Sequence, residues 1–243
     1  MHKVYKLKKN KMKTILLNCY EKKFGIDKFE NIHSLLDTNK LNEDEKNFYN
    51  VPIQLFGKTD RDSPFVKYFY NLFDTDYNIL YEYLHFITKY IKPLYPKEEY
   101  LVIQKTPNIR FHLPGYSNIG SRDKDESKEI IGLHHDGEFG HPETEINVIL
   151  PITEMFDTNS IYYESTPNSN LDYNIYNNLR LKENDFFMGY FNKCNHYNKI
   201  NKTNITRVSL DFRIIPYSKY KDNNKLSATS KTKFEIGKYY MVI

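Results

Sequence analysis

The sequence predicts a mainly β protein, a sandwich or barrel of antiparallel strands with helices in its N-terminal third. After Pro96, short apolar runs are separated by Pro, Gly, Asn and Asp, the residues typical of turns between antiparallel strands. Before Pro96, apolar residues recur at helical spacing from residue 63 onward. A chain of 243 residues can bury a substantial core, and because no long linker divides it we expect a single domain over residues 1–243.

The N-terminal support region, residues 1–96, is predicted to be mostly helical. Within it, residues 14–19 are apolar enough to favour a short strand. Ser63 is a favourable N-cap for a first helix, and a second helix is predicted over 76–92. Both helices carry an apolar stripe, which is typical of packing on a sheet rather than of cofactor binding. We interpret His85, in the second helix, as an ordinary packing or surface histidine.

The core, residues 97–216, is predicted to contain strands at 100–105, 108–113, 129–136, 145–150, 160–165, 185–190 and 205–215. The stretches 114–128 and 137–144 are charged and contain Gly, so we expect them to form loops at the mouth of the barrel. Residues 217–243 follow as a C-terminal extension.

Two-thirds of a metal site is present in the run Gly-Leu-His-His-Asp that ends at Asp136. Side chains two apart on a strand share a face, so His134 and Asp136 are predicted to point the same way and His135 the opposite way. Two histidines and one carboxylate on one face of an iron ion leave the opposite face open for reactants. We therefore expect a third ligand from another strand, and His196 is the best later candidate.

His196 is singled out by the run 205–216, which alternates between a polar and an apolar face. The polar face holds Arg207, Ser209, Asp211 and Arg213, and the apolar face holds Val208, Leu210, Phe212 and Ile214. Arg207 lies eleven residues after His196, and the Ser209 hydroxyl follows on the same face. A guanidinium and a hydroxyl so placed make a fork that suits a carboxylate.

These residues resemble the Fe(II)/2-oxoglutarate-dependent dioxygenases, whose pattern is His-x-Asp, a distal His, and then Arg-x-Ser. Here the pattern reads His134-x-Asp136, His196 and Arg207-x-Ser209. The segments 134–147 and 206–213 look like the branch typified by StrG-like proteins of streptomycin biosynthesis. The resemblance covers roughly residues 104–216. A single His-x-Asp is short enough to recur by chance, whereas the ordered set with these spacings is specific.

The resemblance implies a double-stranded β-helix, a cupin-like jelly roll with iron between its two sheets and helices bracing its major sheet. It implies that His134, Asp136 and His196 are the catalytic metal ligands and hold Fe(II). 2-Oxoglutarate, as cosubstrate, and O2 fill the open positions. Arg207 and Ser209 are expected to bind the far carboxylate of 2-oxoglutarate.

The remaining polar positions support alternatives. Asn147, in mid-strand, either binds cosubstrate or substrate inside the barrel or is a buried amide satisfied by the backbone. Arg110 either contacts substrate or pairs with Asp211. Glu138 and Glu164 are candidates for contact with a polar substrate.

A rival ligand set can be built from His135, Asp136 and His141. Against it, His135 and Asp136 diverge on a strand, and a zinc hydrolase of the His-x-His-x-Asp-His type needs a further histidine that is absent here. Cys194 is interpreted as structural, marking the entry to the His196 strand.

The function implied is hydroxylation or oxidation of a small polar substrate, such as a sugar or aminocyclitol, with 2-oxoglutarate converted to succinate. One alternative is a dioxygenase acting on a protein side chain or a nucleic acid. Another is a jelly roll that binds metal without turnover, although the intact Arg207 and Ser209 count against it.

Composition limits the partners and the compartment. The net charge of +4 is mild and the lysines are dispersed, so charge gives no reason to expect a nucleic-acid partner. Cys19 and Cys194 are too few for a disulfide scaffold, which favours a reducing cytoplasm. The lysine-rich start has no apolar run after it, so neither a signal peptide nor a membrane span is expected.

Overall fold

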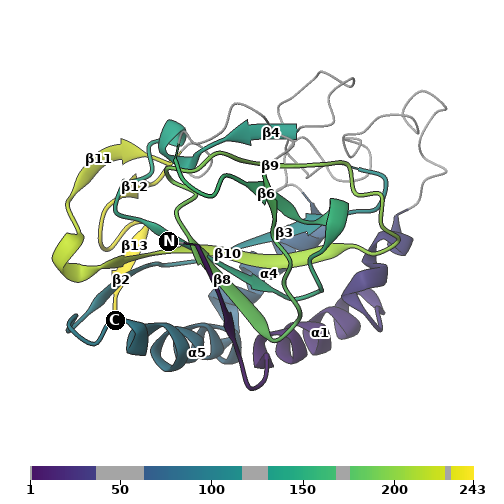
Figure 1. The fold of residues 1–243 in the computed structure, drawn as a ribbon. Coiled ribbons are helices and arrows are strands. Elements are labelled where there is room, and N and C mark those ends of the chain that lie inside the picture. Colours follow the sequence, from purple (N-terminus) through teal and green to yellow (C-terminus); the bar gives the residue numbers. More distant parts are fainter. Residues whose placement is uncertain (1, 37–62, 117–130, 168–175, 228–230) are drawn as a thin grey trace.

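The computed structural model describes residues 2–36, 63–116, 131–167, 176–227 and 231–243. In these residues two antiparallel sheets face each other, and helices cover the outer side of the larger sheet (Figure 1). Most of the predicted loop 114–128 and the start of the predicted strand 129–136 lie outside the described residues.

The strands are β1 (Lys3–Lys6), β2 (Leu101–Gln104), β3 (Asn108–His112), β4 (Ile131–His134), β5 (Ile146–Pro151), β6 (Ile161–Tyr163), β7 (Asn177–Asn178), β8 (Asp185–Gly189), β9 (His196–Asn198), β10 (Arg207–Pro216), β11 (Asn223–Leu226), β12 (Lys233–Phe234) and β13 (Tyr240–Val242). The α-helices are α1 (Lys11–Phe24), α4 (Pro64–Thr75) and α5 (Tyr77–Phe86). Short 3-10 turns cover Phe29–Leu35, Lys92–Leu94, Asp136–Phe139, Asp157–Asn159 and Tyr217–Lys219.

The eight strands from β3 to β10 have the arrangement of a jelly roll. The larger sheet contains the order β3-β10-β5-β8, and the smaller sheet has the order β4-β9-β6-β7. The chain thus passes back and forth between the two sheets, which is how a double-sheet jelly roll is wound. Strands β1, β2 and β13 extend the larger sheet. The predicted fold class, a mainly β jelly roll with N-terminal helices on its major sheet, is confirmed.

The strand predicted over residues 14–19 is wrong, because these residues lie in the middle of α1. The buried side chains of α1 are Met12, Leu16 and Tyr20, four residues apart, which places them on one side of a helix. Asn10 caps the helix by accepting a hydrogen bond from the Lys13 amide, and Gly25 ends it in the left-handed conformation with φ of 71°. Judged over six residues the run looks like a strand, whereas the helical period is visible only over twelve or more.

The two predicted helices on the major sheet are confirmed. The Ser63 hydroxyl accepts a hydrogen bond from the Phe65 amide at the start of α4, and the Asp76 carboxylate accepts one from the Asn78 amide at the start of α5. After α5 the chain continues through a π-helical turn, Ile87–Ile91, so the helical segment extends to the predicted boundary.

The two faces of β10 separate packing from chemistry, as predicted. The apolar side chains Val208, Leu210, Phe212 and Ile214 are fully buried in the core that the helices cover. Tyr83 of α5 packs edge-on against Phe212, with ring centroids 5.1 Å apart. The polar face of β10 therefore lies on the inner side of the major sheet, toward β4 and β9.

The C-terminal extension packs on both the major sheet and the loop after β4. Strand β13 pairs with β2 along Tyr240–Val242. Asn223 donates from Nδ2 to the carbonyl of Gly140 at 3.1 Å, and the ring of Phe234 lies 4.6 Å from that of His141. The extension thus supports the loop that follows the His-x-Asp motif.

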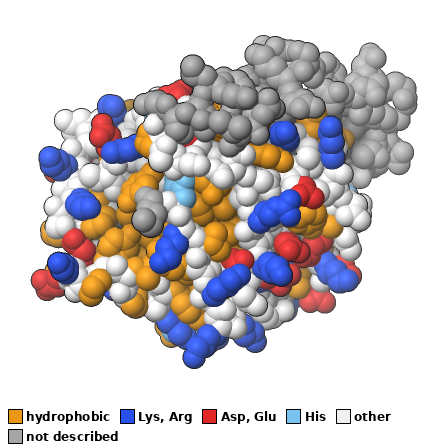
Figure 2. Space-filling model, viewed as in Figure 1, with side chains coloured by type: hydrophobic (Ala, Val, Ile, Leu, Met, Phe, Trp, Pro, Cys, Tyr) orange, Lys and Arg blue, Asp and Glu red, His pale blue; other side chains and the backbone are white. Residues whose placement is uncertain are grey.

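No helix in the described ranges is both long enough and apolar enough to cross a bilayer. On the face shown in Figure 2, Lys and Arg side chains are dispersed among acidic and uncharged ones, and apolar side chains gather around a histidine. This face carries no continuous basic stripe.

The helical assignment of α1 predicts which substitutions destabilise the protein. Leu16→Ala removes a fully buried side chain, so we expect the free energy of unfolding to fall by about 2 to 5 kcal/mol. Asn18→Ala, at an exposed position of the same helix, should change it by less than about 0.5 kcal/mol. Denaturant unfolding of both variants measures this, and equal costs would contradict the packing described.

Candidate metal centre

Three side chains from two distant segments of the chain meet between the two sheets. Ligand atoms of His134, Asp136 and His196 all lie within 4.8 Å of one another. The two His Nε2 atoms are 3.6 and 3.7 Å from Oδ1 of Asp136. His134 and His196 are direct cross-strand partners of β4 and β9, with ring centroids 4.4 Å apart. A small shift brings three such atoms to bonding distance from one ion, about 2.1 Å.

The backbone around Asp136 differs from the prediction although the side-chain directions agree with it. Strand β4 ends at His134, and Asp136 begins a 3-10 turn rather than continuing the strand. The amides of Asp136 and Gly137 donate to the carbonyls of Phe191 and Asn192, which ties the turn to the segment before β9. A Cβ at Gly137 would lie 2.7 Å from the Asn192 carbonyl oxygen, so this close approach requires glycine.

Both histidines of the triad are held in the orientation that metal binding needs. Nδ1 of His134 is hydrogen-bonded to the carbonyl of Gly132, and Nδ1 of His196 to that of Cys194 at 3.2 Å. A ring nitrogen bonded to a carbonyl carries the proton, which leaves Nε2 with its lone pair free for a metal. In each case the carbonyl lies two residues earlier on the same segment.

The two carboxylate oxygens of Asp136 have different surroundings. Oδ2 accepts hydrogen bonds from Nη2 of Arg213 and Nδ2 of Asn147, both at 2.7 Å. Oδ1 faces the two imidazoles instead. Oδ1 is therefore the oxygen available to a metal.

Charge and burial set the protonation of the triad. Burial opposes ionisation of Asp136, but the adjacent Arg213 guanidinium holds the pKa of Asp136 well below its usual range. Burial also disfavours the charged form of His134, yet the hydrogen bond and charge of Asp136 raise the pKa of His134 above its usual value. Burial and the neighbouring His134 lower the pKa of His196 to about 3. An ionised carboxylate beside a neutral imidazole is the state that binds metal.

Aromatic rings enclose the histidines. Phe191 stacks on His196 with centroids 4.5 Å apart, and Phe139 meets His134 edge-on at 5.0 Å. Phe191 belongs to an apolar cluster between the sheets that also contains Phe187 and Ile149. The apolar surroundings limit water around the triad and leave few alternative orientations for the rings.

The rival ligand set of His135, Asp136 and His141 is not brought together. Nδ1 of His135 bonds to the carbonyl of Asn192 at 3.1 Å, and Nδ1 of His141 bonds to Glu145 at 2.7 Å. In the described part of the chain, the group of candidate ligands that converges is His134, Asp136 and His196.

Arg207 and Ser209 lie side by side on the inner face of β10, and both are buried. Nη1 of Arg207 donates to the Ser209 hydroxyl at 3.2 Å, and Nη2 donates to Oδ1 of Asn198 at 3.4 Å. Asn198 is two residues from His196 on β9, a separation of about 7 Å along one strand face. The Arg207 guanidinium is therefore a neighbour of the triad. Burial and the nearby Arg110 lower the pKa of Arg207 to about 9, which leaves it cationic at neutral pH.

The structure places the other predicted site residues as follows. Asn147 donates to Asp136, so it is engaged with the triad itself. Nη2 of Arg110 lies 3.9 Å from Oδ2 of Asp211. The sequence had left open whether Arg110 contacts substrate or pairs with Asp211, and this distance corresponds to the pairing. Glu138 is half exposed and lies 3.5 Å from Nε2 of His135. Glu164 is buried and accepts a hydrogen bond from the Asn195 amide at 2.7 Å, which joins β6 to the turn before β9.

Sequence reasoning missed the contact between Arg213 and Asp136. It placed Arg213 on the polar face of β10 but gave it no role. The available signal was a second arginine six residues after Arg207 on one strand face, flanked by fully buried Phe212 and Ile214. A buried arginine such as Arg213 needs a carboxylate partner, and the predicted ligand Asp136 is one of the carboxylates within its reach.

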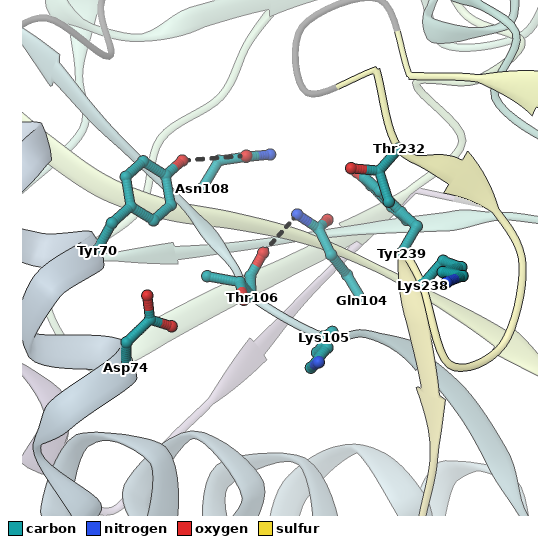
Figure 3. A pocket seen from close by; sticks show the side chains of 9 residues that line it. All are labelled: Tyr70, Asp74, Gln104, Lys105, Thr106, Asn108, Thr232, Lys238 and Tyr239. Atoms are coloured by element: carbon teal, nitrogen blue, oxygen red, sulfur yellow. Dashed lines mark hydrogen bonds between the residues drawn. The ribbon is translucent and has the colours of Figure 1, made fainter.

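A separate hollow of about 270 Å³ lies between the end of α4, the β2–β3 turn and the C-terminal extension (Figure 3). Tyr70 donates there to Asn108 at 3.4 Å, and Tyr239 closes another side. Its charged side chains, Asp74, Lys105 and Lys238, have mixed signs, and none of the triad residues lines it. It therefore indicates no particular ligand.

Comparison with known proteins agrees with the sequence motif. No family model matches the chain. StrG, a streptomycin biosynthesis protein of Streptomyces griseus, is 25% identical over 185 residues, which cover 75% of this chain and 78% of StrG. This chain resembles StrG. The resemblance to StrG-like proteins that the sequence predicted is confirmed.

Two solved structures align with a smaller share of this chain than StrG does. The nickel complex of the non-heme monooxygenase ThoJ aligns with 48% of this chain and 45% of ThoJ, at 15% identity and a TM-score of 0.37. EvdO2 from Micromonospora carbonacea var. aurantiaca, in complex with 2-oxoglutarate, aligns with 63% of this chain and 64% of EvdO2, at 12% identity and a TM-score of 0.37. The alignments thus span about half of ThoJ and under two-thirds of EvdO2.

The buried His112 lies beside Arg207, its cross-strand partner on β10. Its Nδ1 and Nε2 are 3.2 and 3.0 Å from the carbonyl oxygens of Asn159 and Tyr116. Burial and the Arg207 charge lower the pKa of His112 to about 3. His112 therefore stays neutral in the folded protein, whereas in the unfolded chain it takes up a proton below about pH 6.5.

Because the unfolded state binds this proton and the folded state does not, stability falls as the pH drops from about 6.5 toward 3. Between pH 7 and pH 5 we expect the metal-free wild type to lose about 2 kcal/mol more unfolding free energy than His112→Gln loses. Denaturant unfolding at the two pH values measures both losses. Equal losses would contradict the neutral, buried state of His112.

Proposed function

We propose that this protein is a non-haem Fe(II)/2-oxoglutarate-dependent oxygenase, with His134, Asp136 and His196 as the metal ligands. The observation that carries the proposal is the convergence of their three ligand atoms within 4.8 Å, between two sheets of a jelly roll. Two neutral donors and one carboxylate on one side of an ion suit a divalent first-row metal and leave other positions for reactants. The resemblance to StrG over 75% of the chain supports the same conclusion.

The residues around the triad fit this metal and cosubstrate. Each histidine offers Nε2 because its Nδ1 is bonded to a backbone carbonyl, and Asp136 offers Oδ1 because its Oδ2 is engaged. Arg207, with Ser209, would bind the far carboxylate of 2-oxoglutarate and orient it toward the triad. When bound, iron, 2-oxoglutarate and O2 supply the oxidation of a substrate C–H bond, and 2-oxoglutarate is converted to succinate.

The substrate in this proposal is a small polar molecule, such as a sugar or an aminocyclitol. The support is the resemblance to StrG, whose name places it in streptomycin biosynthesis. The dispersed basic side chains on the face in Figure 2 do not favour a nucleic acid. We also assign substrate contacts to Arg110, Glu138 and Glu164. Arg110 is the cross-strand partner of Ser209, and 39% of its side chain is exposed.

Asp136→Ala is expected to abolish iron retention and turnover, because it removes the anionic ligand and leaves Arg213 as a buried cation at the site. Iron content after anaerobic loading and desalting is the measurement. Asp222→Ala, at an exposed position, serves as the matched control and should retain iron as the wild type does. Normal, coupled turnover by Asp136→Ala would refute the ligand assignment.

Arg207→Ala is expected to weaken 2-oxoglutarate binding by about 2 to 5 kcal/mol, because a buried charge pair with the far carboxylate is lost. Calorimetric titration of the Fe(II)-loaded, oxygen-free protein with 2-oxoglutarate gives the affinity. Arg180→Ala removes an exposed arginine that pairs with Asp157 and should leave the affinity unchanged. An unchanged affinity in Arg207→Ala would contradict the role given to this residue.

A further inference from the structure

We propose that Arg213 is a positioning residue that, together with Asn147, fixes Asp136 as a ligand through one oxygen only. The inference rests on the proposed metal site, and it concerns what the chain does to one of the ligands. Asp136 is 5% exposed, and its Oδ2 receives two hydrogen bonds of 2.7 Å, one from each of these residues.

The clamp is built from two neighbouring strands. Arg213 of β10 and Asn147 of β5 are direct cross-strand partners, so their side chains leave the inner face of the major sheet at the same level. Both approach Oδ2 from the sheet, whereas Oδ1 faces the histidines of β4 and β9. A carboxylate held in this way cannot turn to present both oxygens to the same ion.

Arg213 is itself held in place. Its Nη1 lies 3.0 Å from Oδ2 of Asp211, and only 6% of its side chain is exposed. The guanidinium thus bridges Asp136 and Asp211, with one terminal nitrogen toward each. Because Asp211 balances its charge, the Arg213–Asp211 pair directs Asp136 without adding net positive charge beside the metal.

Binding of Asp136 through one oxygen determines how many coordination positions stay free on the metal. Two imidazoles and one carboxylate oxygen would take three positions of a six-coordinate ion and would leave three for other groups. A carboxylate that bound through both oxygens would take one of those three, which a chelating cosubstrate and O2 together require. The clamp therefore keeps the site open, and partners of this kind typically change metal affinity by about 10- to 100-fold.

The decisive test is a Mn²⁺ titration of the full-length, metal-free protein followed by water-proton relaxation. This measurement gives both the affinity for Mn²⁺ and the relaxivity of the bound ion, which reports the water molecules it carries. The variants are Arg213→Met and the charge-balanced double variant Asp211→Asn with Arg213→Met. The control is Arg180→Met, which removes an exposed arginine that pairs with Asp157 and not with a triad residue.

In both Arg213 variants we expect Mn²⁺ to bind about 10- to 100-fold more weakly and the relaxivity per bound ion to fall, while Arg180→Met matches the wild type. Unchanged affinity and relaxivity in the double variant, even with a lowered unfolding midpoint, would overturn the inference. If that variant does not fold, Asn147→Ala removes the other donor, and wild-type values in it would overturn the inference equally. A wild type that binds no Mn²⁺ would instead overturn the proposed function.

Discussion

The contact between Asp136 and Arg213 is the interaction on which the arrangement of the site depends. A carboxylate that is 5% exposed is costly to bury unless it is paired and hydrogen-bonded. Arg213 meets that requirement at Oδ2, and its own charge is balanced by Asp211, so the cation lies between two carboxylates. This leaves Oδ1 toward the two histidines. The carboxylate of Asp136 is therefore in place before any metal binds.

Strand β10 connects this chemistry to the rest of the fold. Its apolar face is fully buried beneath the helices and fixes the strand with respect to them. Its opposite face presents Arg207 next to Asn198 of β9, and Arg213 next to Asp136. The alternation of side chains along a strand thus lets one segment serve the core and the site together. The described α-helices position the triad, although none of them carries a triad residue.

The sequence predicted much of this arrangement, and its failures have physical causes. The triad and the two faces of β10 were predictable because residue type, spacing and strand alternation are local properties. The strand predicted over 14–19 was wrong because Met12, Leu16 and Tyr20 reveal a helix only over a longer window. The sequence placed Arg213 on the polar face of β10 but did not identify Asp136 as its partner, because the two residues are 77 apart and their contact depends on how the two sheets face each other. Gly137 likewise has a role that only the approach of the Asn192 carbonyl reveals.

We propose that the triad and Arg207 form a working oxygenase centre. The most direct test of this proposal is succinate formation from 2-oxoglutarate by anaerobically purified protein supplied with Fe(II) and then with air, with and without a panel of sugars and aminocyclitols. We expect slow succinate release without substrate, loss of that release in His134→Ala, and faster release with a compound of the substrate class. Iron bound at the triad with no succinate formed under any of these conditions would contradict the proposal and favour a jelly roll that binds metal without turnover.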